Sequence, residues 1–275
     1  MTDWPELPDG VAESIEKRWP GRAQPWAEQV EVELRLVCGA HNAVPRHVLP
    51  SRFGFVVAAD SPRGGLVVRS SPDPDALLQA EVALSLAKLG IAPRVHETIA
   101  SDVGLWTVMD EVRPGTPLAL TDRNTVNLRM LAAPFAKMCG QPAPHVDMPS
   151  IFDWLRDRLE DDNLIDVPVY QDGPAPLGER QAALRTLDEL ASTAEPSLCH
   201  GDASTWNLLI SSEGQWVLVD PRGVSGEPDY DLAVIALKLR SDLVPEQAAR
   251  RLAGAAEVDS QRVLSWLAVA EAARV

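Results

Sequence analysis

The spacing of apolar residues near the start of the chain is helical. Val30, Leu34 and Val37 recur at intervals of three and four residues, which places them on one face of a helix. Gly39 follows as a residue that commonly ends helices. The pattern predicts that residues 1–44 are mostly helical and form an extension ahead of the next elements.

From His47 the apolar residues fall into short runs that turn residues interrupt. Turn-forming residues at 51–54 and 60–65 separate three such runs, and this spacing predicts three strands. Residues 73–90 then predict a helix that Asp-Pro opens and Gly ends. Residues 105–112 are strand-like again. We therefore expect a small antiparallel sheet with one main helix.

Beyond residue 113 the periodicity is mainly helical, apart from one hairpin. LLISS (208–212) and QWVLVD (215–220) are short apolar runs joined by Ser-Glu-Gly, which is hairpin spacing. The change from strand-like to helical periodicity predicts an α+β protein of two lobes, residues 1–112 and residues 113–275. Helices are expected at 121–139, 150–162, 176–193, 230–240, 244–254 and 258–273.

Composition narrows the possible partners. The 275 residues carry a formal charge of −15, which argues against a nucleic-acid partner because phosphate binding needs clustered Lys and Arg. The acidic balance could serve solubility or attract a cationic small molecule. No apolar run approaches the ~18 residues of a membrane span, and no signal-peptide pattern opens the chain. We expect a cytoplasmic protein with no membrane partner, in which Cys38, Cys139 and Cys199 are reduced thiols.

The segment HGDASTWN, residues 200–207, and the hairpin after it concentrate oxygen-bearing side chains. A hairpin brings its two ends together, so Asn207 and Asp220 should lie close to each other, with Asp202 on the loop beside them. Two carboxylates and an amide oxygen suit Mg²⁺ rather than zinc. Asp202 is then the candidate that accepts the proton of a substrate hydroxyl during phosphate transfer. Each residue alone could instead be an ordinary turn residue.

The stretches HGD-ASTW-N and VDPRGVSGEPDYDLA, with the two-lobe layout, resemble the aminoglycoside phosphotransferase family. The texture is most similar to the branch of streptomycin and hydroxyurea kinases, with viomycin and capreomycin kinases nearby. The resemblance implies a protein-kinase-like fold with a small N-lobe and a larger, mostly helical C-lobe. It extends more weakly from about residue 47 to the end of the chain.

The resemblance implies a role for each residue of the motif. Asp202 matches the catalytic aspartate, and Asn207 and Asp220 match the magnesium ligands. His200 matches a histidine that braces the loop. Asp231 matches an acidic residue that supports the loop through backbone contacts, although capping of a helix would explain it equally well.

The resemblance also implies a site for ATP or GTP in the N-lobe. A kinase of this kind needs a strand cation for the phosphates and a helix carboxylate that positions it. Arg69 and Glu81 stand at these positions. The expected residue at 69 is Lys, and Arg keeps the charge but is bulkier and planar. Glu81 could instead belong to a solvated helix face. The backbone near Asp110 and Val112 falls where the purine would bind.

Candidates for the acceptor site come from the helix expected at 150–162. Ser150 is a good N-cap, and the spacing of Asp153 and Asp157 places them on one face. In the resemblance these carboxylates and the ring of Trp154 would hold a cationic acceptor. The same pattern could be a solvated face with internal ion pairs.

Two further tryptophans are candidates for the acceptor pocket. Trp206 lies inside the catalytic loop and could line the pocket or pack the loop. The helix expected at 258–273, with Trp266 and Glu271, is a third candidate wall.

Together these features indicate a Mg²⁺-dependent kinase that moves the γ-phosphate of ATP or GTP to a hydroxyl of a small, basic antibiotic. An aminoglycoside such as streptomycin, or a tuberactinomycin peptide such as viomycin or capreomycin, would be inactivated, which confers resistance. One alternative is a small-metabolite kinase of the choline, homoserine or fructosamine type. Another is a pseudokinase that binds without chemistry, and Arg69 is its only support.

Overall fold

The chain divides into two compact units. The computed structural model describes residues 4–122, 125–164, 173–239 and 242–275. The first unit consists of Met1–Ala80 and Pro93–Val112, and the second of Glu81–Ala92 and Arg113–Val275. This division cuts one helix between Ala80 and Glu81, so the lobe boundary after residue 112 stays a prediction.

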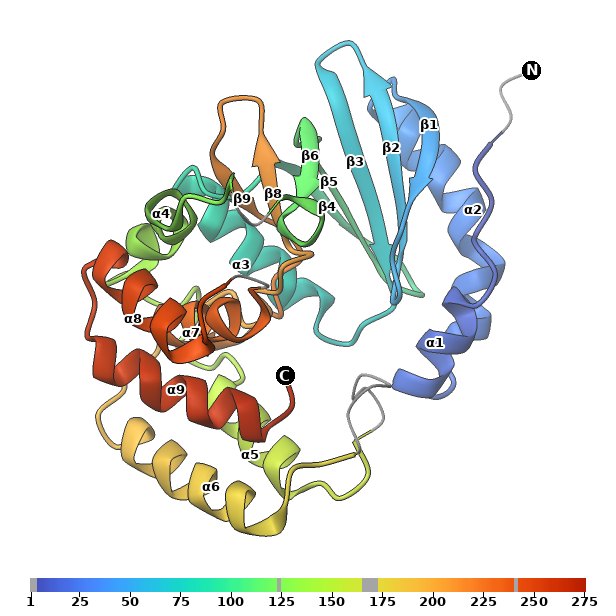
Figure 1. Cartoon of the computed structure of the whole chain (residues 1–275). Coiled ribbons are helices and arrows are strands. Elements are labelled where there is room, and N and C mark those ends of the chain that lie inside the picture. The colour runs from blue at the N-terminus through green and yellow to red at the C-terminus, as the bar shows by residue number, and fades with distance from the viewer. Residues whose placement is uncertain (1–3, 123–124, 165–172, 240–241) are drawn as a thin grey trace. The chain divides into compact units, whose positions relative to one another are not determined.

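A five-stranded antiparallel sheet forms the centre of the first unit. Its strand order is β1-β2-β3-β5-β4 (Figure 1). Three consecutive strands follow the N-terminal helices, as the spacing of apolar runs predicts. The strands are β1 (Val44–Leu49), β2 (Phe55–Ser61), β3 (Gly64–Ser71), β4 (Val95–Ala100) and β5 (Leu105–Asp110).

Strand β4 is an element that the sequence analysis missed. It lies at the edge of the sheet, and a bulge between Val95 and Glu97 interrupts its pairing with β5. Because an edge strand has one partner, it tolerates polar residues such as His96 and lacks a continuous apolar run. The strand predicted at 105–112 is confirmed in place, but β5 ends at Asp110.

The predicted N-terminal extension is helical and belongs to the core of the first unit. Trp26, Val30 and Leu34 are fully buried against the sheet residue Trp106, and the indole Nε1 of Trp26 donates to Ser70 Oγ at 2.9 Å. The extension is therefore part of the packed unit. Its helices are α1 (Val11–Arg18) and α2 (Ala23–Ala40).

Helix α3 (Ala76–Lys88) lies within the helix predicted at 73–90, but it begins three residues after Asp73. The carboxylate of Asp73 accepts the backbone N–H of Asp75 at 2.9 Å, in the turn that leads into the helix. Gly90 follows the helix with a φ of 67°, a conformation that favours glycine.

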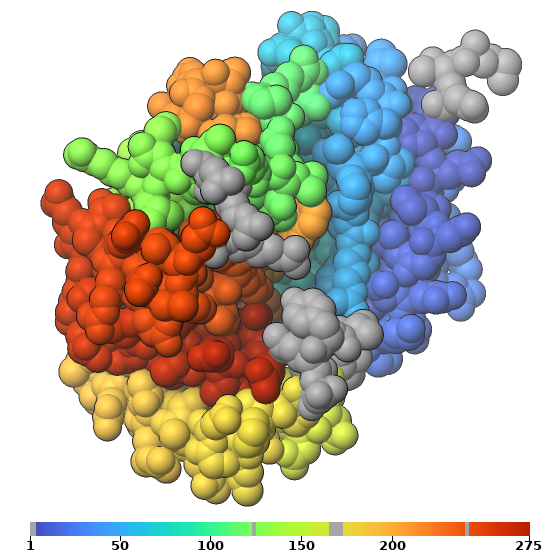
Figure 2. Space-filling model, viewed as in Figure 1, coloured from blue at the N-terminus to red at the C-terminus, as the bar shows by residue number. Residues whose placement is uncertain are grey.

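Helices make up most of the second unit, as predicted. Figure 2 shows α6 in yellow and α8 and α9 in red on its surface. In the core, the rings of Phe152 and Tyr230 pack against Trp266 with centroid distances of 4.9 and 5.4 Å. The helices are α4 (Leu128–Met138), α5 (Ile151–Glu160), α6 (Leu177–Ala191), α7 (Pro228–Lys238), α8 (Pro245–Ala256) and α9 (Ser260–Ala272).

Helix α4 starts later than the predicted helix at 121–139. The side chain of Asn127 accepts the backbone N–H groups of Arg129 at 2.9 Å and Met130 at 3.4 Å, so Asn127 caps a helix that begins at Leu128. The predicted start at 121 is therefore wrong. Residues 123–124 of that predicted helix, and residue 240 of the helix predicted at 230–240, lie outside the described residues.

The predicted hairpin is present as β8 and β9, in a three-stranded sheet of order β6-β8-β9. Beyond the strands, the backbone N–H of Val219 donates to the carbonyl of Asn207 at 3.0 Å, so the two ends of the hairpin do meet. Among the described helices none is long and apolar enough to cross a membrane. The remaining elements are β6 (Pro114–Pro117), the 3-10 helix η1 (Leu118–Leu120), β7 (Ser197–Leu198), β8 (Leu208–Ser211), β9 (Trp216–Leu218) and β10 (Ser225–Gly226).

Candidate active site

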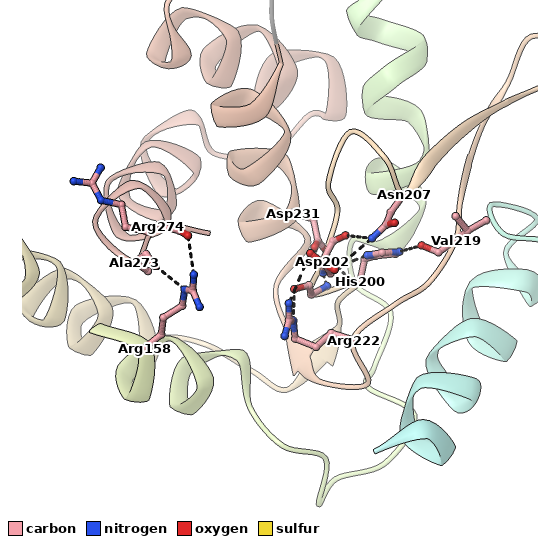
Figure 3. Close-up of polar contacts among 10 residues, drawn as sticks. Arg158, His200, Asp202, Asn207, Val219, Arg222, Asp231, Ala273 and Arg274 are labelled. Carbon is pink, nitrogen blue, oxygen red and sulfur yellow. Dashed lines mark hydrogen bonds and ion pairs between the residues drawn. The ribbon is translucent and has the colours of Figure 1, made fainter. Parts of the chain in front are cut away.

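The loop before β8 is organised around the buried ring of His200. Nε2 of this ring donates to the carbonyl of Val219 at 2.9 Å, and Nδ1 accepts the backbone N–H of Asp202 at 3.3 Å (Figure 3). Burial lowers the pKa of His200 from its ordinary 6.5, because a buried ring resists gaining a charge. The neutral ring therefore connects the loop to the end of β9.

Asp231, on α7, accepts hydrogen bonds from the backbone of the same loop. Its Oδ2 accepts the N–H of His200 at 2.8 Å and the thiol of Cys199 at 3.4 Å, and its Oδ1 accepts the N–H of Gly201 at 2.9 Å. The side chain is fully buried, and desolvation raises its pKa to about 7. This geometry supports the loop-bracing assignment of Asp231 more than the capping one.

The position of Asp202 is set by its neighbour Asn207. Nδ2 of Asn207 donates to the backbone carbonyl of Asp202 at 2.9 Å and to its carboxylate Oδ2 at 3.4 Å. The side chain of Asp202 is 39% exposed, so an acceptor hydroxyl can reach it. Since Nδ2 makes both bonds, the amide oxygen of Asn207 is the atom left for a cation.

Asp220 follows β9 in a left-handed conformation. Its φ of 56° is unusual for a residue with a Cβ, and such strain commonly marks functional positions. The preceding residue, Val219, is held by both Asn207 and His200, so Asp220 leaves the hairpin at a defined point and is exposed. The described residues contain no group of three or more His, Cys, Asp or Glu side chains placed to share a metal ion. Two carboxylates with one amide oxygen nevertheless match the hard ligands of Mg²⁺, which keeps several waters.

Arg222 is a site residue that the sequence analysis did not assign. Its Nη2 lies 3.7 Å from Oδ1 of Asp202, and its Nε donates to the carbonyl of Gly201 at 3.1 Å. The guanidinium stacks on Trp154, with Cζ 4.1 Å from the ring centroid. The only sequence signal was a cation two residues after Asp220, and the contact with Trp154 is not visible from spacing.

In the first unit, Arg69 of β3 is held by α3. Nη2 of Arg69 donates to Oε1 of Gln79 at 3.2 Å, and Nε2 of Gln79 donates to Oδ2 of Asp73 at 2.6 Å. Gln79 was not among the sequence candidates, although it lies one turn along the predicted helix from Asp75. These two hydrogen bonds, from Arg69 to Gln79 and from Gln79 to Asp73, orient the guanidinium of Arg69, which stands at the position expected for a phosphate-binding cation.

The other nucleotide-site candidates are divided between the units. Oε2 of Glu81, in the second unit, lies 2.9 Å from Nε2 of His145 without hydrogen-bond geometry. In the first unit, Asp110 Oδ1 contacts His96 Nε2 at 2.6 Å, so its side chain is engaged within the sheet. Val112 follows β5 at the end of the first unit.

The acceptor candidates differ in exposure. Asp153 and Asp157 are exposed on α5, which fits either a solvated face or a cation site. Trp206 is 58% exposed, which leaves its ring open to a ligand. Trp266 is fully buried and its Nε1 donates to Glu227 at 2.8 Å, so the suggestion that it forms a pocket wall is wrong. Its apolar bulk is needed in the core between α5, α7 and α9.

A profile of the phosphotransferase enzyme family matches residues 48–267. The chain belongs to the phosphotransferase enzyme family. No curated protein sequence matches this phosphotransferase. The family match confirms the resemblance found in the catalytic loop and the hairpin after it.

Three solved structures are similar to this phosphotransferase along most of its length. A choline/ethanolamine kinase family protein from Mesorhizobium loti is 18% identical with a TM-score of 0.64, over 88% of this chain and 83% of its own. Aminoglycoside-3′-phosphotransferase of type VIII is 22% identical with a TM-score of 0.58, over 86% and 97%. Spectinomycin phosphotransferase, in complex with ADP and spectinomycin, is 12% identical with a TM-score of 0.54, over 86% and 83%. At these identities the likeness concerns the fold, and it confirms the predicted α+β, protein-kinase-like class.

Proposed function

We propose that this phosphotransferase is a Mg²⁺-dependent kinase that transfers the γ-phosphoryl group of ATP or GTP to a hydroxyl of a small, basic antibiotic. The observation that carries the proposal is the half-exposed carboxylate of Asp202, held between His200 and Asn207. A carboxylate held in this way can orient a hydroxyl and accept its proton.

The residues around Asp202 supply positioning more than covalent chemistry. The hydroxyl donates its hydrogen to the carboxylate of Asp202, which receives the proton as the new O–P bond forms. His200 and Asn207 keep that carboxylate in one orientation through the backbone N–H and carbonyl of the same residue. Asp231 stabilises the backbone on the N-terminal side of the loop. Phosphoryl transfer depends mainly on such positioning and on charge stabilisation.

The amide oxygen of Asn207 and the carboxylate of Asp220 are the proposed ligands for Mg²⁺. A bound magnesium ion would neutralise charge on the triphosphate. Arg69 of the first unit is the proposed phosphate-binding cation, and the backbone near Asp110 and Val112 is the proposed purine site. Glu81, which belongs to the second unit, is the expected partner of Arg69. The ADP bound to the similar spectinomycin phosphotransferase supports a nucleotide co-substrate.

A basic acceptor is supported by two observations. The protein carries a formal charge of −15, which concentrates cations near its surface. The similar structures include two phosphotransferases named for antibiotics, aminoglycosides and spectinomycin. Exposed Asp153, Asp157 and Trp206 are the proposed contacts for an ammonium group and a ring.

A small-metabolite kinase is the second candidate. It is favoured by the similarity to a choline/ethanolamine kinase family protein, whose TM-score of 0.64 exceeds those of the two antibiotic phosphotransferases. Both candidates share the chemistry at Asp202 and differ in the acceptor. An acceptor panel therefore separates them.

The proposal is tested by following transfer of labelled phosphate from ATP and GTP to basic antibiotics, choline, ethanolamine and homoserine. We expect Asp202→Asn to lower kcat by about 100-fold or more with unchanged nucleotide affinity, because proton acceptance is lost. Asp102→Asn is the matched control, since it removes the same charge from an exposed turn between β4 and β5. Growth of a sensitive host that expresses either protein on each antibiotic provides a second readout.

Equal turnover by Asp202→Asn and wild type would refute the role of this carboxylate. A folded wild-type protein that binds nucleotide but phosphorylates no acceptor would instead favour a pseudokinase. Turnover restricted to choline, ethanolamine or homoserine would select the metabolite kinase.

A further inference from the structure

Arg222 lies beside the catalytic carboxylate on the second unit. Figure 3 shows Arg222 and Asn207 approaching Asp202 from different sides. Its side chain is 25% exposed, and Nη2 is 3.7 Å from Oδ1 of Asp202. That separation is too long for a hydrogen bond. The contact is an ion pair that leaves the Nη donors of the guanidinium available.

Two contacts hold this guanidinium in place before any ligand binds, and a third fixes the backbone that carries it. The backbone N–H of Arg222 donates to the carbonyl of His200 at 2.9 Å, and Nε donates to the carbonyl of Gly201 at 3.1 Å. The guanidinium plane rests on Trp154, 4.1 Å from the ring centroid. A long, flexible side chain normally loses conformational entropy when it binds a ligand. Here most of that ordering already exists in the folded protein.

The free edge of the guanidinium consists of Nη1 and Nη2. In the described part of the chain, neither nitrogen donates a hydrogen bond to a protein acceptor. A planar guanidinium with two free Nη groups is suited to binding two oxygens of one phosphoryl group. Such a set of unused, fixed donors beside a catalytic base needs an explanation beyond loop support, for which the Nε bond suffices.

The catalytic loop itself supplies no positive charge. The four residues between Asp202 and Asn207 are Ala, Ser, Thr and Trp. During transfer, negative charge spreads over the oxygens of the moving phosphoryl group, and fixed cations near it lower the barrier. Among the described residues of this unit, Arg222 is the cation that lies against Asp202.

We propose that Arg222 is a further catalytic residue, which donates its Nη N–H groups to the oxygens of the transferring phosphoryl group. The inference rests on the proposed kinase function. In the step, the acceptor oxygen forms a bond to the γ-phosphorus, and the bond from that phosphorus to the bridging oxygen breaks. The hydroxyl proton goes to Asp202, and the nucleoside diphosphate leaves with the bond's electron pair. Arg222 is unchanged, and its charge offsets the charge on the phosphoryl oxygens.

Trp154 becomes a positioning residue in this arrangement. Its ring also lies 5.4 Å from Cζ of Arg158, whose guanidinium donates to the carbonyls of Ala273 and Arg274. The indole is thus placed between the site cation and the C-terminal end of α9. This use of the ring differs from the earlier suggestion that it stacks on the acceptor.

The test compares binding of a ground-state and a transition-state analogue by calorimetry, with no acceptor present. The probes are AMP-PNP and ADP with aluminium fluoride, each with Mg²⁺. We expect Arg222→Gln to weaken the aluminium fluoride complex by about 100-fold and AMP-PNP by no more than about threefold, because the bonds form fully only in the transition state. Arg222→Lys should recover part of the loss, since it keeps the charge but not the planar fork.

Two further variants separate a catalytic from a merely structural role. Arg185→Gln removes one positive charge from the exposed face of α6 and should change neither affinity. Trp154→Phe keeps an aromatic surface and should retain most of the affinity for the aluminium fluoride complex. Trp154→Ala should selectively weaken the aluminium fluoride complex. Thermal unfolding of each variant confirms that it is folded.

Several outcomes would overturn the inference. These are equal losses of both analogues in Arg222→Gln, no loss of either, or a wild type that binds ADP–aluminium fluoride no better than ADP. In the turnover assay of the proposed function, an effect of Arg222→Gln confined to the KM of the acceptor would assign Arg222 to acceptor binding instead. A wild type that binds no Mg-nucleotide would refute the proposed function as well. Normal AMP-PNP binding in every variant means that a failure of the aluminium fluoride prediction concerns the role of Arg222 and not the proposed function.

Discussion

Replacement of Gly201 by alanine should destabilise the catalytic loop through two separable effects. Gly201 has a φ of 76°, and a Cβ there would lie 2.6 Å from Val224 Cγ2 and 3.0 Å from Arg222 Cβ. The left-handed conformation costs an L-residue about 1–2 kcal/mol. The steric overlap adds about 1–3 kcal/mol, as for other overpacked sites. We expect Gly201→Ala to lower the free energy of unfolding by about 2–5 kcal/mol.

Gly214→Ala provides a control for the backbone term. Gly214 lies in the turn between β8 and β9 with a φ of 74°, and a Cβ there would meet no atom within 4 Å. It should therefore lose only the conformational part, about 1–2 kcal/mol. The difference between the two variants isolates the steric contact with Val224 and Arg222.

Urea unfolding followed by circular dichroism measures both losses, and hydrogen exchange of the Gly201 amide reports the loop directly. The exchange rate at position 201 should rise in Gly201→Ala, because the added Cβ would strain the hydrogen bond from this N–H to Asp231. Equal destabilisation by Gly201→Ala and Gly214→Ala would refute the close packing inferred around this loop.

Three more predictions concern the elements that support the site. Burial lowers the pKa of His200, so its contribution to stability is present above pH 6.5 and is lost as the pH falls through 6.5. The stability advantage of wild type over His200→Asn in urea unfolding should therefore shrink between pH 7.5 and 5.5. Asp231, with a pKa raised to about 7, is common to both proteins, so its titration cancels in the difference. A constant difference would contradict this. Ser150→Ala should cost about 1 kcal/mol of unfolding free energy, because Ser150 Oγ accepts the N–H of the second following residue at the start of α5, and Ser150→Asp should retain most of it. Gln79→Ala should weaken AMP-PNP binding about fivefold, equivalent to ~1 kcal/mol, because it releases Arg69, and unchanged affinity would count against Arg69 as the phosphate cation.

The approach of Asp202, Asn207 and the end of β9 to one another was predictable because its geometry is local. The loop from His200 to Asn207 leads into a two-stranded hairpin, and pairing of Asn207 with Val219 follows from hairpin closure. The α+β class was likewise readable from periodicity, since a strand-rich stretch precedes a mainly helical one. Edge strand β4 was missed because one-sided pairing imposes little apolar pattern.

The supporting contacts were beyond sequence reasoning because they join distant segments through single side chains. Trp154 and Arg222 meet only when α5 and the loop after β9 are packed together. Gln79 holds Arg69 through a contact between helix and strand that no repeat or motif signals. The suggestion that Trp266 lines a pocket was wrong because an aromatic side chain is compatible both with a pocket and with a core, and the sequence does not distinguish the two.

Two of the contacts that link the segment after β9 to the catalytic loop use the backbone of Val219, one through its N–H and one through its carbonyl. Substitutions at this position therefore leave both hydrogen bonds in place. Proline is the exception because it lacks the backbone N–H, so homologous proteins should carry varied residues at position 219 but not proline.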